Sequence, residues 1–119
     1  MKRWLSNLAA AALFLGIGGA ALAEPDASAL FQSNCAACHG GDRLGAIGPA
    51  LLPDNLGRLG VAGAENVIRN GRTATQMPAF GAELDDASIK ALAAFVYTPP
   101  ATKPVWGEKE IVASRVLTP

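Results

Sequence analysis

Cys35-Ala36-Ala37-Cys38-His39 is the stretch of this 119-residue chain that decides its fold. Residues three and four positions apart share one face of a helical turn, so two thiols and one imidazole converge on the same side. Cys-x-x-Cys-His is the attachment sequence of c-type heme. The thiols of Cys35 and Cys38 would bond to the porphyrin edge, and His39 would reach the iron as its proximal ligand. The chain has no other cysteine or histidine, so we predict one heme c.

The motif has three other interpretations. A structural zinc site needs about four Cys or His ligands, and only three are available here. A disulfide between Cys35 and Cys38 remains open in an oxidising compartment. A thioredoxin-like redox site would need a βαβ context, which the pattern of the chain does not suggest. Heme attachment is therefore the favoured interpretation.

Residues 1–23 are predicted to be a cleaved signal peptide. Lys2 and Arg3 precede an apolar run over residues 8–22, and Ala21-Leu22-Ala23 matches the small-residue cleavage pattern. The run is about 15 residues long, against the roughly 20 of a membrane-spanning helix, which disfavours an uncleaved anchor. Removal after Ala23 places the mature protein in the periplasm, the compartment in which bacteria typically attach c-type heme.

The remaining chain reads as one small domain over residues 24–100 with an extension over residues 101–119. Without Lys2 and Arg3 the chain keeps eight basic and ten acidic side chains, a balance that argues against a nucleic-acid partner. Aromatic residues make up only 6% of the chain. A domain this small buries limited apolar surface, and a covalently held porphyrin would complete its core.

The first helix is expected to start at Asp26 or Ser28 and to run into the heme motif, stopped by Gly40-Gly41. Residues 42–63 are rich in Gly, Pro and Asn, and are predicted to form an irregular loop with room for one helical turn.

The second clear helix covers residues 64–70, with Gly71 as a left-handed C-cap. A loop over residues 72–84 follows. The last helix starts at Asp85 or Asp86, and Pro99-Pro100 ends it. No segment alternates apolar and polar residues for long enough to indicate a strand. We therefore predict an all-α fold with short helices and long loops around the heme.

Met77 is the predicted sixth ligand of the iron. It is the only methionine left after the signal peptide, and cytochromes commonly complete His coordination with a thioether, which raises the reduction potential. The alternatives are core packing by Met77, and a lysine, a water molecule or an open position at the iron. His/Met coordination indicates a non-enzymatic electron carrier, whereas a detachable Met77 would indicate a heme-based ligand sensor or a peroxidase-like enzyme.

Taken together, these motifs resemble class I cytochrome c over most of the chain that follows residue 23. The matching segments are Cys35-Ala36-Ala37-Cys38-His39-Gly40, Gly48-Pro49-Ala50-Leu51, Asn70-Gly71, Met77-Pro78-Ala79-Phe80-Gly81 and Leu92-Ala93-Ala94-Phe95-Val96. The resemblance implies that the Pro49 carbonyl accepts a hydrogen bond from the His39 ring, and that Leu51 packs on the heme. It also implies that Phe31 meets the last helix near Phe95.

The chain departs from the family at the heme propionates, because it has no counterpart of the tryptophan that often binds them. The replacements considered are Asn55, Arg58, Arg69 and Arg72, of which Arg72 is preferred. A merely solvated arginine is the competing interpretation of Arg72.

A narrower resemblance rests on residues 42–53, 71–78 and 101–115. These segments are similar to the small periplasmic cytochromes c associated with cytochrome cd1 nitrite reductase and to cytochrome c domains joined to a d1-heme propeller. The resemblance implies a stand-alone carrier in denitrification that donates electrons to nitrite reductase, or accepts them in heme d1 maturation. Trp106, Ile111 and Val112 are too apolar for an idle tail.

Overall fold

The computed structural model describes residues 23–115, so residues 1–22 of the predicted signal peptide lie outside the described residues. The described part of the chain contains helices and no strand, which confirms the all-α prediction for that range. None of its helices has the length and hydropathy needed to span a bilayer. The helices are α1 (Ala27–Asn34), α2 (Ala36–His39), α3 (Pro53–Leu56), α4 (Gly60–Asn70), α5 (Asp86–Val96) and α6 (Glu108–Ala113).

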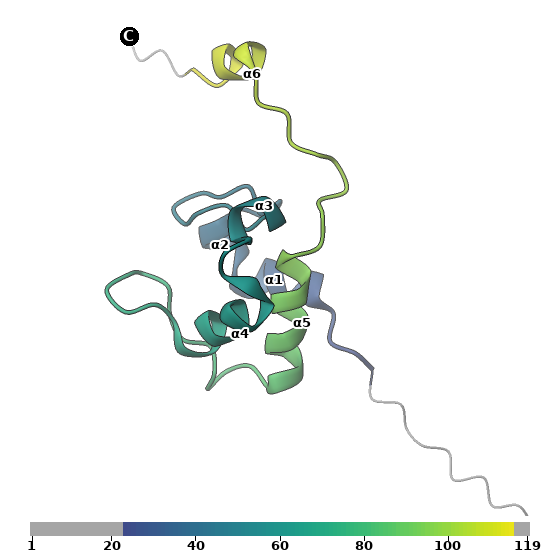
Figure 1. Cartoon of the computed structure of the whole chain (residues 1–119), viewed down its shortest axis with the longest axis vertical. Coiled ribbons are helices and arrows are strands. Elements are labelled where there is room, and N and C mark those ends of the chain that lie inside the picture. The colour runs from purple at the N-terminus through teal and green to yellow at the C-terminus, as the bar shows by residue number, and fades with distance from the viewer. Residues whose placement is uncertain (1–22, 116–119) are drawn as a thin grey trace, which may run out of the picture.

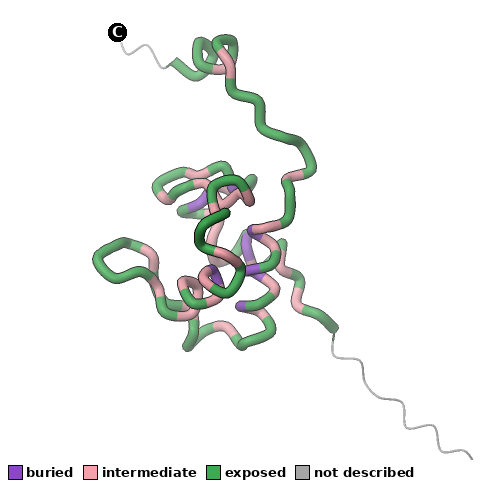
Figure 2. Tube along the Cα trace, in the orientation of Figure 1, coloured by how far each residue is buried: buried purple, intermediate pink, exposed green. Residues whose placement is uncertain are grey.

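The core lies where α5 packs against α1 and α4 (Figure 1). Phe31 of α1 and Leu92 of α5 are fully buried and pack with Val96, and Figure 2 shows buried positions along α5. The rings of Phe31 and Phe95 lie 5.5 Å apart between centroids, at an interplanar angle of 52°. The predicted contact of Phe31 with the helix that carries Phe95, which is α5, is therefore confirmed.

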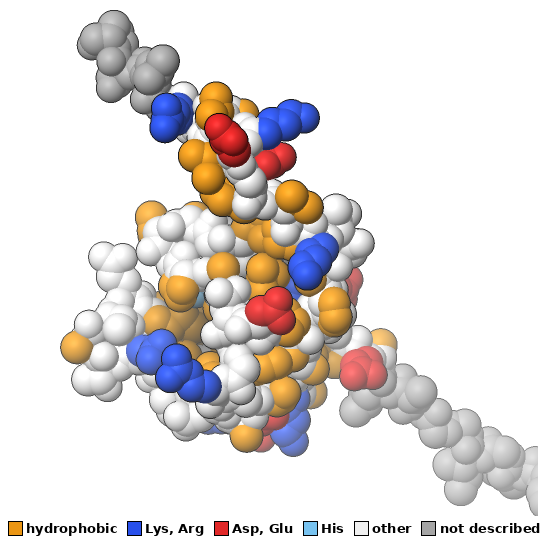
Figure 3. All heavy atoms as spheres, turned by 45° about the horizontal axis from the view of Figure 1, so that its top comes forward, with side chains coloured by type: hydrophobic (Ala, Val, Ile, Leu, Met, Phe, Trp, Pro, Cys, Tyr) orange, Lys and Arg blue, Asp and Glu red, His pale blue; other side chains and the backbone are white. Residues whose placement is uncertain are grey.

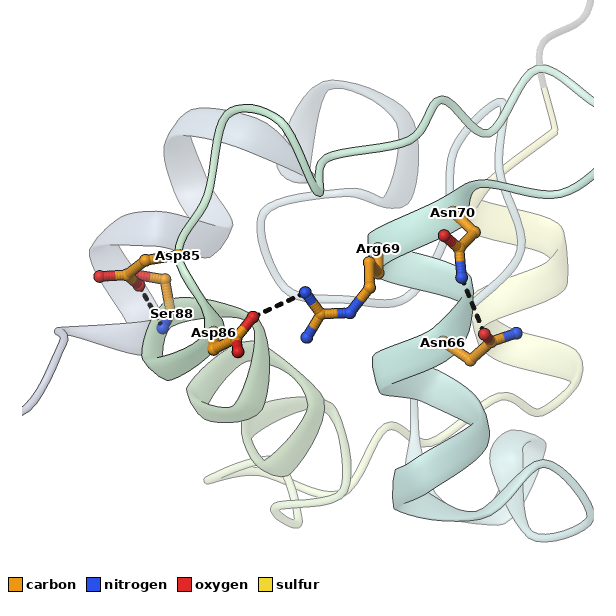
Figure 4. Close-up of polar contacts among 6 residues, drawn as sticks. All are labelled: Asn66, Arg69, Asn70, Asp85, Asp86 and Ser88. Carbon is orange, nitrogen blue, oxygen red and sulfur yellow. Dashed lines mark hydrogen bonds and ion pairs between the residues drawn. The ribbon is translucent and has the colours of Figure 1, made fainter.

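Aspartate side chains cap the two helices of this core. Asp26 accepts a hydrogen bond of 3.0 Å from the Ala29 N–H, and Asp85 accepts one of 2.8 Å from the Ser88 N–H (Figure 4). Each contact satisfies a backbone donor that the first helical turn leaves free. The hydrogen bonds from Ser88 lower the pKa of Asp85. Of the two caps considered for each helix, Asp26 and Asp85 are the ones formed.

Helix α4 corresponds to the helix predicted over residues 64–70, but it starts earlier than predicted. It begins at Gly60 and not at residue 64. Gly60 has a φ of +71°, a conformation that glycine adopts without a steric penalty. A Cβ at Gly63 would lie 2.8 Å from Leu59 Cδ1, so the absent side chain leaves room for Leu59. The glycines that indicated a loop are thus part of the helix and its packing.

The end of α4 matches the prediction in part. Gly71 has a φ of +70°, as a left-handed cap requires, but its ψ of −169° is extended. Its N–H donates to the Val67 carbonyl. The chain therefore leaves the helix in an extended direction at Gly71.

Arg43 connects the loop after α2 to the end of α5. The side chain is buried at 6% exposure and donates to the carbonyls of Phe95 at 2.8 Å and Thr98 at 2.9 Å. Its guanidinium carbon lies 4.7 Å from the centroid of the Phe95 ring, a cation–π distance. The Arg43 carbonyl accepts from the Leu51 N–H at 2.9 Å. One residue thus ties the 40–51 loop to the end of α5.

Replacing Arg43 by methionine is expected to lower the free energy of unfolding by about 1.5–3 kcal/mol, since charged hydrogen bonds of this strength would be lost. Urea denaturation of the heme-loaded protein measures the change. Arg58→Met is the matched control, because Arg58 is exposed and a surface substitution changes stability by only about 0.5 kcal/mol. Equal effects of the two substitutions would contradict the role given to Arg43.

The C-terminal extension leaves the core after α5 and carries α6 away from it (Figure 1). The Gly107 N–H donates to Glu110 Oε2 at 2.9 Å and begins α6. Val105 and Trp106 are 73% and 71% exposed. The apolar residues of the tail were expected to have a role, but the described part of the chain shows nothing that buries Val105 and Trp106.

Candidate heme site

A cavity of about 470 Å³ lies among α2, α4 and the loops that follow α2 and α4. Its volume falls within the range of about 300–1,000 Å³ typical of ligand pockets. Figure 3 shows a hollow bordered by hydrophobic side chains, with basic side chains nearby. The structure brings all seven predicted site residues to the cavity wall: Cys35, Cys38, His39, Pro49, Leu51, Arg72 and Met77.

His39 is buried at 8% exposure and is held through one ring nitrogen. Its Nδ1 lies 2.8 Å from the Pro49 carbonyl oxygen, which is the contact that the family resemblance implies. Since a carbonyl only accepts hydrogen bonds, Nδ1 carries a proton, and in the neutral ring Nε2 therefore keeps its lone pair. A histidine in this state is prepared to bind a metal through Nε2.

Gly48 lets the backbone reach the histidine ring. Its N–H donates to the Cys38 carbonyl at 2.7 Å. A Cβ at Gly48 would lie 2.9 Å from Cε1 and 3.0 Å from Nδ1 of His39, closer than carbon atoms normally approach. The contact between His39 and the Pro49 carbonyl thus depends on the missing side chain of Gly48.

Replacing Gly48 by alanine is expected to lower the yield of heme-loaded protein severalfold, because the added methyl group displaces the His39 ring from the Pro49 carbonyl. Loss of an outer-shell contact of this kind costs roughly 10–100-fold in metal affinity. Heme absorbance per unit of purified protein measures the effect. Gly57→Ala is the matched control, since its Cβ would meet only the Pro53 carbonyl oxygen, at 4.0 Å. Equal yields from both variants would contradict this role of Gly48.

The two cysteines differ in their surroundings, and they are not joined to each other in a disulfide. Cys38 is exposed and Cys35 is half-buried. Burial, with a smaller effect of Cys38, raises the pKa of Cys35 to about 11.

Met77 reaches the cavity from a loop that is fixed to the end of α4. The N–H of Phe80 donates to the Ile68 carbonyl at 2.9 Å, and the N–H of Gly81 to the Arg69 carbonyl at 3.0 Å. A Cβ at Gly71 would lie 2.7 Å from the Met77 carbonyl oxygen. Only glycine allows this close approach, so Gly71 and two backbone hydrogen bonds fix the two ends of the loop that carries Met77.

Among the four residues considered for the propionates, only Arg72 lines the cavity. Arg69 instead forms an ion pair of 2.7 Å with Asp86 at the start of α5 (Figure 4). Asn55 and Arg58 are exposed and do not line the cavity. Of the four candidates, Arg72 is therefore the one placed to bind a propionate carboxylate of a heme in the cavity.

Most of the remaining wall of the cavity is apolar, with polar side chains from Asn34, Thr75 and Gln76, and it was only partly anticipated from the sequence. Leu56 and Leu59 fall in a segment predicted to be an irregular loop, where spaced leucines could have indicated a buried face. Arg43, which does not line the cavity, was also missed as a buried residue. The wall also contains Ile47, Ala64, Val67, Ile68, Phe80 and Val96.

The residues of the cavity fit a heme c. The Cys-x-x-Cys-His motif contributes two thiols and an imidazole to the cavity wall, and the loop after α4 contributes a soft thioether. The apolar wall suits the porphyrin face, and Arg72 suits a propionate.

A comparison with protein families finds that residues 23–96 match the model described as cytochrome c oxidase, cbb3-type, subunit III. The chain is 48% identical over 106 residues to a dihydro-heme d1 dehydrogenase from Pseudomonas aeruginosa. That match covers 88% of this chain and 22% of the dehydrogenase, so the chain spans about a fifth of that relative.

Solved structures show the same relationship. The structure of dihydro-heme d1 dehydrogenase NirN in complex with DHE matches with a TM-score of 0.70 and 49% identity, over 76% of this chain and 19% of that one. The c-type cytochrome NirC matches with a TM-score of 0.55 and 27% identity, over 59% of this chain and 82% of that one.

Proposed function

Since this chain belongs to the class I cytochrome c family, we propose that it carries single electrons in the periplasm, after removal of residues 1–23. The predicted class I fold is confirmed, and the chain is a monoheme c-type cytochrome related to NirN and NirC. The observation that carries the proposal is the cavity that joins Cys35, Cys38, His39 and Met77.

Each site residue has a role in this proposal. Within the domain formed by residues 24–100, Cys35 and Cys38 would attach the heme covalently, and His39 and Met77 would bind its iron. Two further side chains and one carbonyl support them: Leu51 packs on the porphyrin, Arg72 binds a propionate, and Pro49 orients His39.

The bound heme supplies one-electron chemistry by cycling between Fe(III) and Fe(II). The Pro49 carbonyl keeps the proton of His39 on Nδ1 and thereby raises the basicity of Nε2. Apolar side chains in the wall would limit the contact of the heme with water, and neither His39 nor Met77 needs to leave during one-electron transfer. The residues therefore support electron transfer without substrate chemistry.

The mouth of the cavity is the surface where we place the redox partner. Cys38 is exposed, and Ile47 lines the cavity while being 78% exposed. Transient redox complexes use small interfaces, below about 1,200 Å². Because the interface is small, the removal of one apolar side chain at the mouth should weaken the contact measurably.

The partner that we propose is cytochrome cd1 nitrite reductase. The experiment mixes the reduced protein with purified nitrite reductase in a stopped-flow instrument and follows oxidation of its heme. We expect rapid oxidation, slowed severalfold by Ile47→Ser. Val61→Ser is the matched control, because Val61 is 42% exposed but does not line the cavity. A reduced protein that stays reduced would contradict this partner.

A second partner is favoured by the 48% identity to a dihydro-heme d1 dehydrogenase. In that case the oxidised protein accepts electrons during heme d1 maturation. The test mixes the oxidised protein with such a dehydrogenase and dihydro-heme d1, and follows reduction of heme c. Reduction here without reaction toward nitrite reductase would assign the protein to maturation.

A further inference from the structure

The loop between α4 and Met77 contains a closed set of hydrogen bonds around Thr75. The Thr75 hydroxyl donates to the Arg72 carbonyl at 2.9 Å and accepts from the Met77 N–H at 3.2 Å. The Thr75 N–H donates to the same Arg72 carbonyl at 3.1 Å, and the Arg72 N–H donates to the Met77 carbonyl at 3.2 Å. One hydroxyl therefore joins the backbones at both ends of this loop.

The backbone of this loop is strained at one position. Ala74 has a φ of +61°, a left-handed conformation that is unfavourable for a residue with a Cβ. Such a residue persists only where its surroundings hold it in place. The two bonds of the Thr75 hydroxyl are adjacent to Ala74 and provide that restraint.

The rest of the loop gives the thioether little support. Residues 72–76 are exposed, and Met77 is half-buried. Backbone contacts fix the chain on both sides, at Gly71 and at Phe80. Between those two points, both of the side-chain hydrogen bonds that the structure describes are made by the Thr75 hydroxyl.

We propose that Thr75 is the positioning residue for Met77, and that its hydroxyl sets how often the thioether leaves the iron. This inference rests on the proposed function, in which Met77 is the sixth ligand. When the hydroxyl bonds break, the strained turn at Ala74 relaxes and the backbone of Met77 moves. Thr75 thereby controls the access of small exogenous ligands to the site.

The experiment compares Thr75→Val, Thr75→Ser and Thr73→Val in the oxidised, heme-loaded protein. Valine keeps the shape of threonine but removes both hydroxyl bonds, and serine keeps the hydroxyl. Thr73 is exposed and serves as the matched control in the same loop. Imidazole is the probe, because it binds only when the sixth position is vacated. The sulfur-to-iron absorption band and the urea midpoint are recorded for every protein.

We expect Thr75→Val to bind imidazole roughly five- to tenfold faster than the unmodified protein. This change corresponds to the loss of the one hydroxyl bond that reaches Met77, since the Thr75 N–H still donates to the Arg72 carbonyl. The Thr75→Ser protein should keep the rate within about twofold of the unmodified one, a margin well below that of one hydrogen bond. The Thr73→Val protein should behave like the unmodified one.

Two outcomes overturn the inference, and they are distinguishable. A Thr75→Val protein with an unchanged imidazole rate, whether or not its urea midpoint falls, shows that Thr75 does not position Met77. An unmodified protein without a sulfur-to-iron band, and with imidazole binding as fast as in Met77→Leu, shows that Met77 is not a ligand. The second outcome also overturns the proposed function, whereas the first leaves it intact.

Discussion

Replacing Met77 by leucine or alanine is expected to lower the reduction potential by on the order of 0.2 V, part of the span of about 0.8 V over which axial ligands set heme potentials. The reason is that a soft thioether stabilises Fe(II) relative to Fe(III). The heme should remain attached, because Cys35, Cys38 and His39 are unchanged. The iron should become high-spin or water-ligated and lose its sulfur-to-iron band.

Two variants separate ligation from packing at this position. Met77→Leu conserves the volume of the side chain, and Met77→Ala does not. A redox titration with parallel visible spectra should therefore give similar potentials for both variants. An unchanged potential in Met77→Leu would mean that another group is the sixth ligand, and a change in Met77→Ala alone would mean that Met77 acts by packing.

Replacing His39 by alanine is expected to reduce the amount of heme-loaded protein by more than roughly tenfold, since the loss of a mere outer-shell partner already costs about 10–100-fold in metal affinity. His39 lies in the cavity, and the Pro49 carbonyl keeps its Nε2 available. A heme stain after denaturing electrophoresis, normalised to total protein, measures the loss.

Ile47→Ala is the control for this experiment, because Ile47 also lines the cavity but offers no ligand atom. It should load heme as well as the unmodified chain does. Normal loading of the His39→Ala protein would contradict the assignment of His39 as the proximal ligand.

The sequence predicted the parts of the site that depend on local spacing. Cys35, Cys38 and His39 belong to one helical turn, so their convergence follows from helix geometry. Met77 was predicted by elimination, because the chain after residue 23 has no other methionine. Asp26 and Asp85 were each one of two candidates, beside Ser28 and Asp86, given by the preference of such residues for helix starts.

Features that depend on distant contacts could not be predicted in the same way. Arg43 binds carbonyls 52 and 55 positions along the chain, and an arginine between loop glycines usually indicates a solvated side chain. The early start of α4 was missed because Gly60 and Gly63 are poor helix formers, and the packing against Leu59 is a tertiary effect. The Thr75 turn has a local signal, since threonine hydroxyls commonly bond backbone groups two or three residues away.

The mass of the mature, exported protein tests the central claim most directly. The protein is produced in a host that assembles periplasmic c-type cytochromes, and its intact mass is measured after denaturation. We expect the mass of a polypeptide that begins at Glu24 plus one covalently bound heme, and the bare polypeptide mass for the double substitution of Cys35 and Cys38 by alanine. A bare polypeptide mass for the unmodified protein would contradict the account.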